Sequence, residues 1–194
     1  AHKRVKNIYA GPGCRIEQDR AWLTSLVKSN GHVLENELNA IMAGAYGRDV
    51  VDAGRYVIDN PVIINPVVAA SNRAVLLCTP DGSAPRPELL KVAVRIVDNA
   101  QTVSTNGLIQ VGSGSVNAAT VIVQDVSLVA AWLSAAVIIN GDKAIVSRVW
   151  GVNKGKSNAR YGVRSAARGT TFSAVEFKGV RKAFARTFGP IDLD

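Results

Sequence analysis

The pattern of apolar and polar residues changes character near Gly47. Before it, apolar residues recur at helical spacing in two segments, and we expect helices over residues 16–28 and 33–46. A glycine-rich stretch, Gly11-Pro12-Gly13, precedes them, so residues 1–15 are expected to form an extended arm. Because so short a helical pair cannot bury its own apolar stripe, we expect it to cap the next domain or contact a neighbouring subunit.

After Gly47 the helical periodicity stops and short β-branched runs appear, separated by Asn, Gly, Asp and Ser. This pattern predicts an all-β domain, built as a sandwich, an antiparallel barrel or a β-helix. The eleven runs are Tyr56–Ile58, Val62–Ile64, Val75–Leu77, Val92–Val97, Leu108–Val111, Val121–Val126, Ala136–Ile139, Ala144–Val149, Tyr161–Val163, Phe172–Phe177 and Ala183–Ala185.

Internal similarity favours the β-helix among these three architectures. Residues 120–129, 143–152 and 171–180 align with one another. The alignment places Val126, Val149 and Phe177 in one column, and it places Val129, Val152 and Val180 in another. The repeat of 23 to 28 residues holds two or three short strands, which is the length of one coil. We therefore predict about five coils over residues 47–188, followed by a tail over residues 189–194.

Residues 54–64, with the sequence GRYVIDNPVII, are followed by Ser71-Asn72-Arg73-Ala74-Val75-Leu76. This stretch resembles the first coil of pectate-lyase-like right-handed parallel β-helices, as found in bacteriophage tailspikes and other virion surface proteins. The resemblance covers about three quarters of the chain, and it concerns the fold and not an activity. It implies a trimeric coil stack in a virus particle or in an exported carbohydrate-active protein. Tailspike enzymes are several times longer, and the helical pair is not one of their features.

Charge is distributed unevenly along a chain whose formal net charge is +8. Residues 1–142 contain 12 Lys and Arg and 12 Asp and Glu, whereas residues 143–194 contain 11 and 3. Such asymmetry indicates an acidic partner, which could be a protein shell, an acidic glycan or nucleic acid; a solvated basic face is the alternative. The predicted docking patch consists of Lys154, Lys156, Arg160, Arg164, Arg168, Lys178, Arg181, Lys182 and Arg186.

Carboxylates are the candidate catalytic groups, because glycosidases use pairs of them. The alignment places Asp125 and Glu176 in one column with Arg148 between them. An arginine there lowers the pKa of both acids, whereas a general acid needs a raised pKa. We therefore predict a structural charge ladder and no catalytic residues. The two histidines and two cysteines lack metal-ligand spacing, so neither a metal nor another cofactor is expected.

Two cysteines, Cys14 and Cys78, are too few for a disulfide framework. Reduced thiols are one interpretation; an inter-chain disulfide is the other, because Cys14 lies in the predicted arm. Trp132 and Trp150 are expected in the core or at a subunit interface, with a sugar-binding platform as the alternative. The longest apolar stretches are too short to cross a bilayer, so no membrane partner is expected.

The function predicted from these features is that of a structural virion protein. It would be a capsid decoration (cement) protein or a small tail-associated spike, acting as a homotrimer that docks on an acidic protein surface. The first alternative is a carbohydrate-active or glycan-binding β-helix, such as a polysaccharide depolymerase. The second is a nucleic-acid-binding module, although Tyr161 is the only aromatic residue between Lys154 and Arg168.

Overall fold

The computed structural model describes residues 3–5, 8–17, 41–43, 49–51, 55–66, 73–77, 89–98, 107–112 and 120–186. Within these ranges all the assigned secondary structure is β-strand. The described residues therefore include no helix that could cross a membrane. The strands are β1 (Lys3–Val5), β2 (Ile8–Ala10), β3 (Arg15–Glu17), β4 (Ile41–Ala43), β5 (Asp49–Val51), β6 (Arg55–Ile64), β7 (Val75–Leu77), β8 (Leu89–Val97), β9 (Ile109–Val111), β10 (Val121–Ala130), β11 (Ala135–Ile139), β12 (Lys143–Asn153), β13 (Ala159–Ser165), β14 (Gly169–Lys178) and β15 (Val180–Arg186).

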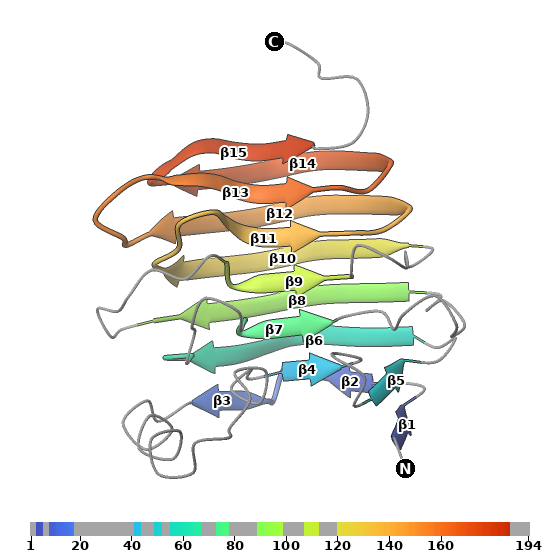
Figure 1. Ribbon diagram of the computed structural model, residues 1–194. Helices are drawn as coiled ribbons and strands as arrows, with labels where there is room; N and C mark the ends of the chain where they lie inside the picture. Colours follow the sequence, from blue (N-terminus) through green and yellow to red (C-terminus); the bar gives the residue numbers. More distant parts are fainter. Residues whose placement is uncertain are drawn as a thin grey trace, which may run out of the picture.

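The strands form two main sheets in which all neighbours are parallel. The first, the long-strand sheet, has the order β14-β12-β10-β8-β6-β2, with β3 also paired to β6. The second, the short-strand sheet, has the order β15-β13-β11-β9-β7-β4. From β6 onward the chain alternates between the sheets, so each pair of strands adds one turn to a stack (Figure 1). All-parallel strands in two sheets are compatible with a parallel β-helix.

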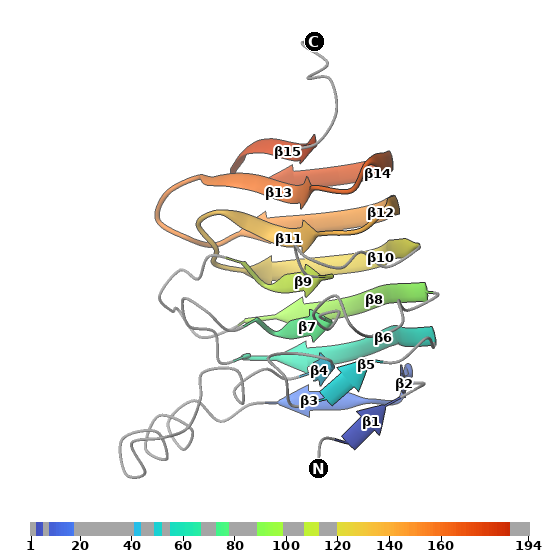
Figure 2. The same cartoon turned by 45° about the vertical axis from the view of Figure 1, so that its right-hand side comes forward.

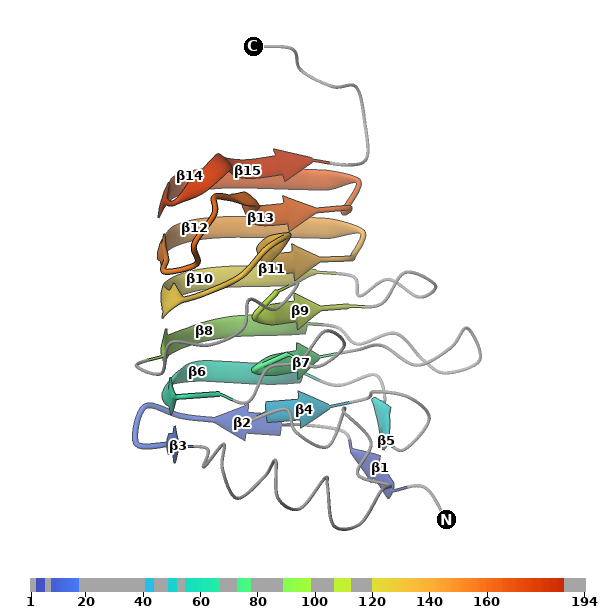
Figure 3. The ribbon, with the colours of Figure 1, turned by 60° about the vertical axis from the view of Figure 1, so that its left-hand side comes forward.

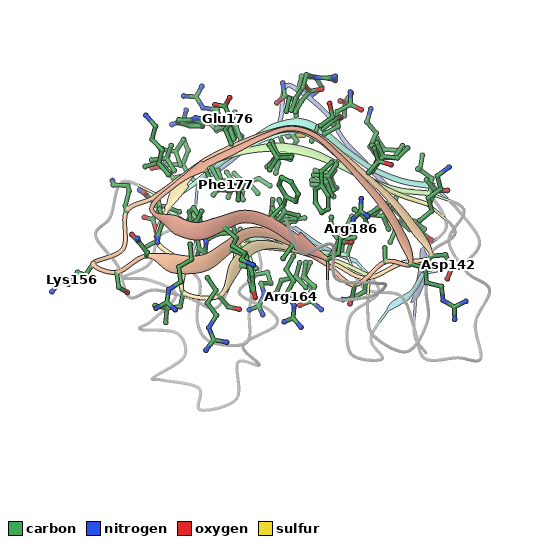
Figure 4. All side chains as sticks on the ribbon, turned by 90° about the horizontal axis from the view of Figure 1, so that it is seen from above. Asp142, Lys156, Arg164, Glu176, Phe177 and Arg186 are labelled. Carbon is green, nitrogen blue, oxygen red and sulfur yellow. The ribbon has the colours of Figure 1, made fainter. Side chains whose placement is uncertain are left out.

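The core lies between the two sheets, as the view down the stack shows (Figure 4). Strand register brings equivalent side chains of successive turns into columns. Tyr56, Leu90, Val121 and Ala144 form one buried column of the long-strand sheet. Val75, Ile109, Val137 and Val163 form the facing buried column of the short-strand sheet. Aliphatic side chains, repeated in this way, fill the core from turn to turn. Figures 2 and 3 show the stacked turns from two further sides.

A left-handed residue bends each long strand except β8. Asn60, Asp125, Arg148 and Ala174 have φ angles of 60°, 55°, 52° and 52°. Asp125, Arg148 and Ala174 occupy the same place in successive turns. Strand β8 has one residue fewer than β6 and β10 between the registered pairs on either side of the bend, so it follows the arc without this residue. The bend lets one continuous strand form two sides of the core, as the arched ribbon in Figure 4 shows.

The last turn, formed by β14 and β15, contains large aromatic side chains. All four phenylalanines of the chain lie between residues 172 and 188. Phe177 lies over the preceding turn, where a Cβ at either Gly151 or Gly162 would overlap its ring. The Phe177 ring meets Trp132 edge to face, with 6.0 Å between ring centroids. Two glycines in one turn therefore make room for a phenylalanine in the next.

The expected helices disagree with the structure wherever their residues are described. Ile16 and Glu17 belong to strand β3, and Ile41, Met42 and Ala43 form strand β4. Parallel pairing with β6 and with β7 fixes these residues as strands, overriding the helical spacing of the apolar residues. Most of the two predicted helices, residues 18–40 and 44–46, lies outside the described residues.

The expected arm is also replaced by strands where it is described. Strand β2 pairs with β6, and β1 pairs with β5. Between β2 and β3 the backbone turns at Gly11, whose carbonyl accepts a hydrogen bond from the Cys14 amide at 3.0 Å. The glycine-rich motif is therefore a turn between two strands that both pair with β6.

The contact between Gly151 and Phe177 can be tested with a double-mutant cycle. We expect Gly151→Ala to lower the free energy of unfolding by about 1–3 kcal/mol, because the new methyl group overlaps the Phe177 ring. In a Phe177→Ala background the same change should be neutral or stabilise the fold by about 0.4–1 kcal/mol, through loss of glycine chain entropy. Urea denaturation of the four proteins measures the cycle. An equal cost of Gly151→Ala in both backgrounds would show that the ring does not occupy this space.

Candidate docking surface

Positive charge is concentrated in the last two turns of the stack. Residues 143–186 contain eleven Lys and Arg and a single acidic residue, Glu176. All nine residues of the predicted docking patch are exposed. The structure nevertheless distributes them over several sides of the stack, as Figure 4 shows for three of them. Lys156 lies at one end of the cross-section, Arg164 projects from the outer side of the short-strand sheet, and Arg186 lies over the core.

Five of the nine come from the last two strands of the short-strand sheet: Arg160 and Arg164 on β13, and Arg181, Lys182 and Arg186 on β15. Because Arg186 lies over the core, we give the name basic face to the other four: Arg160, Arg164, Arg181 and Lys182. Strands β13 and β15 are hydrogen-bonded neighbours, with Tyr161 opposite Lys182 and Arg164 opposite Ala185. Within the described residues, no carboxylate forms an ion pair with any of the four. The same register places Arg160 opposite Arg181, and like charges in opposite positions repel one another, so an anion bound here would relieve a cost already present in the fold.

Asn153 fixes the loop that carries Lys154 and Lys156. Its Oδ1 accepts hydrogen bonds from the Trp132 amide at 3.2 Å and the Gly155 amide at 3.0 Å. Its Nδ2 donates to the Ser157 carbonyl at 3.1 Å and to the Gly179 carbonyl at 3.0 Å. One amide side chain thus satisfies its full hydrogen-bonding capacity and joins three successive turns. Lys154 Nζ adds a hydrogen bond to the Asp98 carbonyl at 3.3 Å.

Asp125 and Arg148 form a two-point ion pair at the bend of the long strands. Arg148 Nε donates to Asp125 Oδ1 at 2.6 Å, and Arg148 Nη2 donates to Asp125 Oδ2 at 3.0 Å. Hydrogen bonding from Arg148 is the main reason that the pKa of Asp125 lies below its ordinary value of 3.8. A carboxylate held ionised in this way is a poor general acid. The pair therefore has the geometry of a structural contact.

The third member of the predicted ladder is displaced. Glu176 lies opposite Trp150, and the residue next to Arg148 in the following turn is Ala174. The alignment had matched Phe177 to Val149, whereas Val149 in fact pairs with Val175 and Gly151 with Phe177. A slip of two residues keeps every apolar residue on its own side of the strand, so the apolar pattern could not reveal it. For the same reason Val152 pairs with Lys178 rather than matching Val180, which belongs to β15.

Arg186 differs from the other basic residues in its surroundings. Its guanidinium carbon lies 5.8 Å from the centre of the Phe172 ring, which itself stacks on Phe184 with 4.4 Å between centroids. Arg186 therefore lies over the apolar end of the stack, where it makes a cation–π contact. It is not part of the basic face.

The remaining candidate residues fall in different places. Trp132 is fully buried and donates its indole N–H to the Tyr161 carbonyl at 2.9 Å, whereas Trp150 is 39% exposed on the outer side of β12. Cys14 is an exposed free thiol, and its carbonyl accepts a hydrogen bond from the Val62 amide. Cys78 lies outside the described residues, so a disulfide stays a prediction. No group of three or more His, Cys, Asp or Glu within the described ranges could hold a metal ion.

Sequence reasoning missed Asn153 and the phenylalanine-rich end. Asn153 follows an apolar strand directly, which is a typical corner position, but single Asn residues follow many strands. The placement of every phenylalanine after residue 171 was readable from the sequence and is the better signal.

Comparisons with protein-family models, with curated proteins and with solved structures each found no match for this chain.

The ion pair predicts how Asp125 titrates. We expect Arg148→Gln to raise the pKa of Asp125 towards 3.8, because the main group that lowers it is removed. The native pair stabilises the fold above that ordinary pKa, and this contribution disappears as pH falls through the lowered pKa. Carboxyl ¹³C NMR titration measures the change. Arg95→Gln serves as the control, since Arg95 is not among the groups that shift this pKa, and an unchanged Asp125 titration in Arg148→Gln would contradict the assignment.

Proposed function

We propose that this chain is a structural protein of a virus particle, which docks on an acidic protein surface through its last two turns. The observation that carries the proposal is the basic face together with the near absence of acidic residues between 143 and 186. Electrostatic docking needs neither a pocket nor a catalytic group. In this proposal the fold is a right-handed parallel β-helix of the pectate-lyase-like type, and the protein acts as a capsid decoration protein or a small spike.

Trimer formation belongs to the same proposal and has an observation in its favour. The outer side of the long-strand sheet carries a column of half-buried aliphatic residues, Ile64, Val97, Val129 and Val152. Exposed Trp150 lies on the same strand as Val152. An apolar strip on the outside of a sheet is a surface that a sister subunit can cover.

A glycan-binding function is the second candidate, and Trp150 is the observation that favours it. Its exposed ring stands beside Glu176 on the neighbouring strand. An exposed aromatic ring next to a carboxylate can stack on a sugar and accept hydrogen bonds from its hydroxyl groups. Loss of polysaccharide binding on Trp150→Ala, with the trimer intact, would support this candidate over an interface role.

The docking proposal can be tested with two defined polyanions, poly-glutamate and a single-stranded DNA of equal charge. We expect poly-glutamate binding that weakens with salt. Replacing Arg160, Arg164, Arg181 and Lys182 together by Gln should weaken it about thirtyfold, taking roughly 0.5 kcal/mol for each exposed charge contact. Surface plasmon resonance at several salt concentrations provides the measurement.

The control replaces Arg15, Lys91 and Arg95 by Gln, which removes positive charge from turns before the last two. An equal loss of binding per removed charge in both variants would show that only net charge matters, and clearly tighter binding to DNA would favour the nucleic-acid alternative. Sedimentation equilibrium with and without reductant tests the trimer and the Cys14 cross-link. A stable monomer in both conditions would contradict the assembly.

A further inference from the structure

At the C-terminal end of the stack, no strand among the described residues covers the cross-section of the core. Phe184 continues the column of Val137 and Val163, which are both 0% exposed, yet it is itself 48% exposed. Phe172 and Val175 are likewise only partly buried, whereas Val146 and Val149 beneath them are buried. Among the described strands β14 is the outermost of its sheet, so the backbone N–H and C=O groups along its outer side are available to pair with a further strand.

The winding of the chain fixes where the next strand begins. Three residues separate β11 from β12, and three separate β13 from β14. Strand β15 ends at Arg186, so a further strand of the long-strand sheet with the same spacing would begin at Pro190. Proline is accepted at the first residue of a strand, where its missing N–H costs one hydrogen bond.

The register of the last turns then assigns each following residue. Ser165 is opposite Ile139, and Arg186 is opposite Ser165. Lys143 follows Ile139 by four residues and Gly169 follows Ser165 by four residues, and Lys143 and Gly169 are again opposite each other. By the same count Ile191 falls on Thr170 and Leu193 falls on Phe172, in the two columns that face the core.

The sequence of this segment alternates in phase with those columns. Ile191 and Leu193 take the core-facing positions, while Asp192 and Asp194 fall beside Thr171 and Ser173, which are exposed. A slip of one residue would place both aspartates over the core, so the alternation excludes that slip, and the constant three-residue spacing between the sheets favours this register over a slip of two. In this register the two carboxylates would lie next to turns in which Glu176 is the only acidic residue between 143 and 186.

We propose that residues 190–194 are the occupant of this open end: they add a further parallel strand to the outer side of β14, with Leu193 packed on the Phe172 ring. A second copy of the chain fits the end less well, because it would bring Lys178, Arg181 and Arg186 against their own counterparts. The inference stands independently of the docking function. It makes the end of the stack a strand-accepting surface and leaves the basic face on its side for a partner.

Methyl NMR on the full chain tests directly whether residues 190–194 pack against β14. We expect nuclear Overhauser contacts between the Leu193 methyl groups and the Phe172 ring, with the methyl signals shifted upfield by ring current. The Thr187 amide should be protected from hydrogen exchange, since the equivalent Ala166 amide donates to the Ile139 carbonyl at 2.8 Å. Leu193→Ala assigns the signals by removing them. Random-coil shifts over residues 190–194 would overturn the proposal, as would contacts that appear only between labelled and unlabelled copies in a mixture.

A matched pair of substitutions gives a second, independent measurement. Leu193→Asn should lower the melting temperature by roughly 4–8 °C, because a core-facing leucine is lost. Asp192→Asn creates the same residue one position earlier, on the solvent side, and should change the melting temperature by less than about 1 °C. Equal effects of the two substitutions would show that the segment does not alternate between core and solvent, and would sink the register assigned here.

Discussion

Parallel register is the constraint on which the rest of this structure depends. Each residue of a strand lies about 4.8 Å from its equivalent one turn earlier, so every side chain must be compatible with the two that flank it in its column. Columns of Val, Ile and Leu satisfy this condition on the core side. The same rule holds for polar positions. Asp125 and Arg148 are opposite charges at consecutive places of one column, and Asn153 satisfies backbone groups of the turns on both sides of it.

Side-chain volume can also differ between neighbours in a column, provided that a small residue in one turn lies next to a large one in the following turn. The column that runs through Ile63, Ile96 and Leu128 continues with Gly151 and then Phe177, so the space left by the glycine is filled by a large side chain of the next turn. The last turn contains Phe172, Phe177 and Phe184, and it also belongs to the two turns in which positive charge is concentrated. The rings close the core where no further described turn covers it, and the basic residues surround that end. Together they make this end of the stack chemically different from its middle.

Much of this architecture could be predicted from the sequence, and the parts that could not share a cause. All eleven β-branched runs coincide with strands, with Leu108 falling just before β9. The columns Val126–Val149 and Val129–Val152 are confirmed. The third repeat was misplaced by two residues because apolar alternation has a period of two and cannot distinguish such slips. Helical spacing around Ile16 and Ile41 misled for a related reason: short apolar segments fit either periodicity, and pairing with β6 and β7 decided the outcome. The basic residues of the predicted patch are all exposed, but only the strand order shows which of them are neighbours.

Each long strand from β8 to β12 is hydrogen-bonded only to the strands one turn before and after it. In a chain wound in this way, each turn is held by its two neighbouring turns. Tension applied at its C-terminal side would act on the outermost turn alone, and each released turn would expose the next to the same load. Resistance to pulling would then be set by single turns and not by the whole core. A turn of 26 residues, the separation of Val149 from Val175, would release about 90 Å of chain at each step.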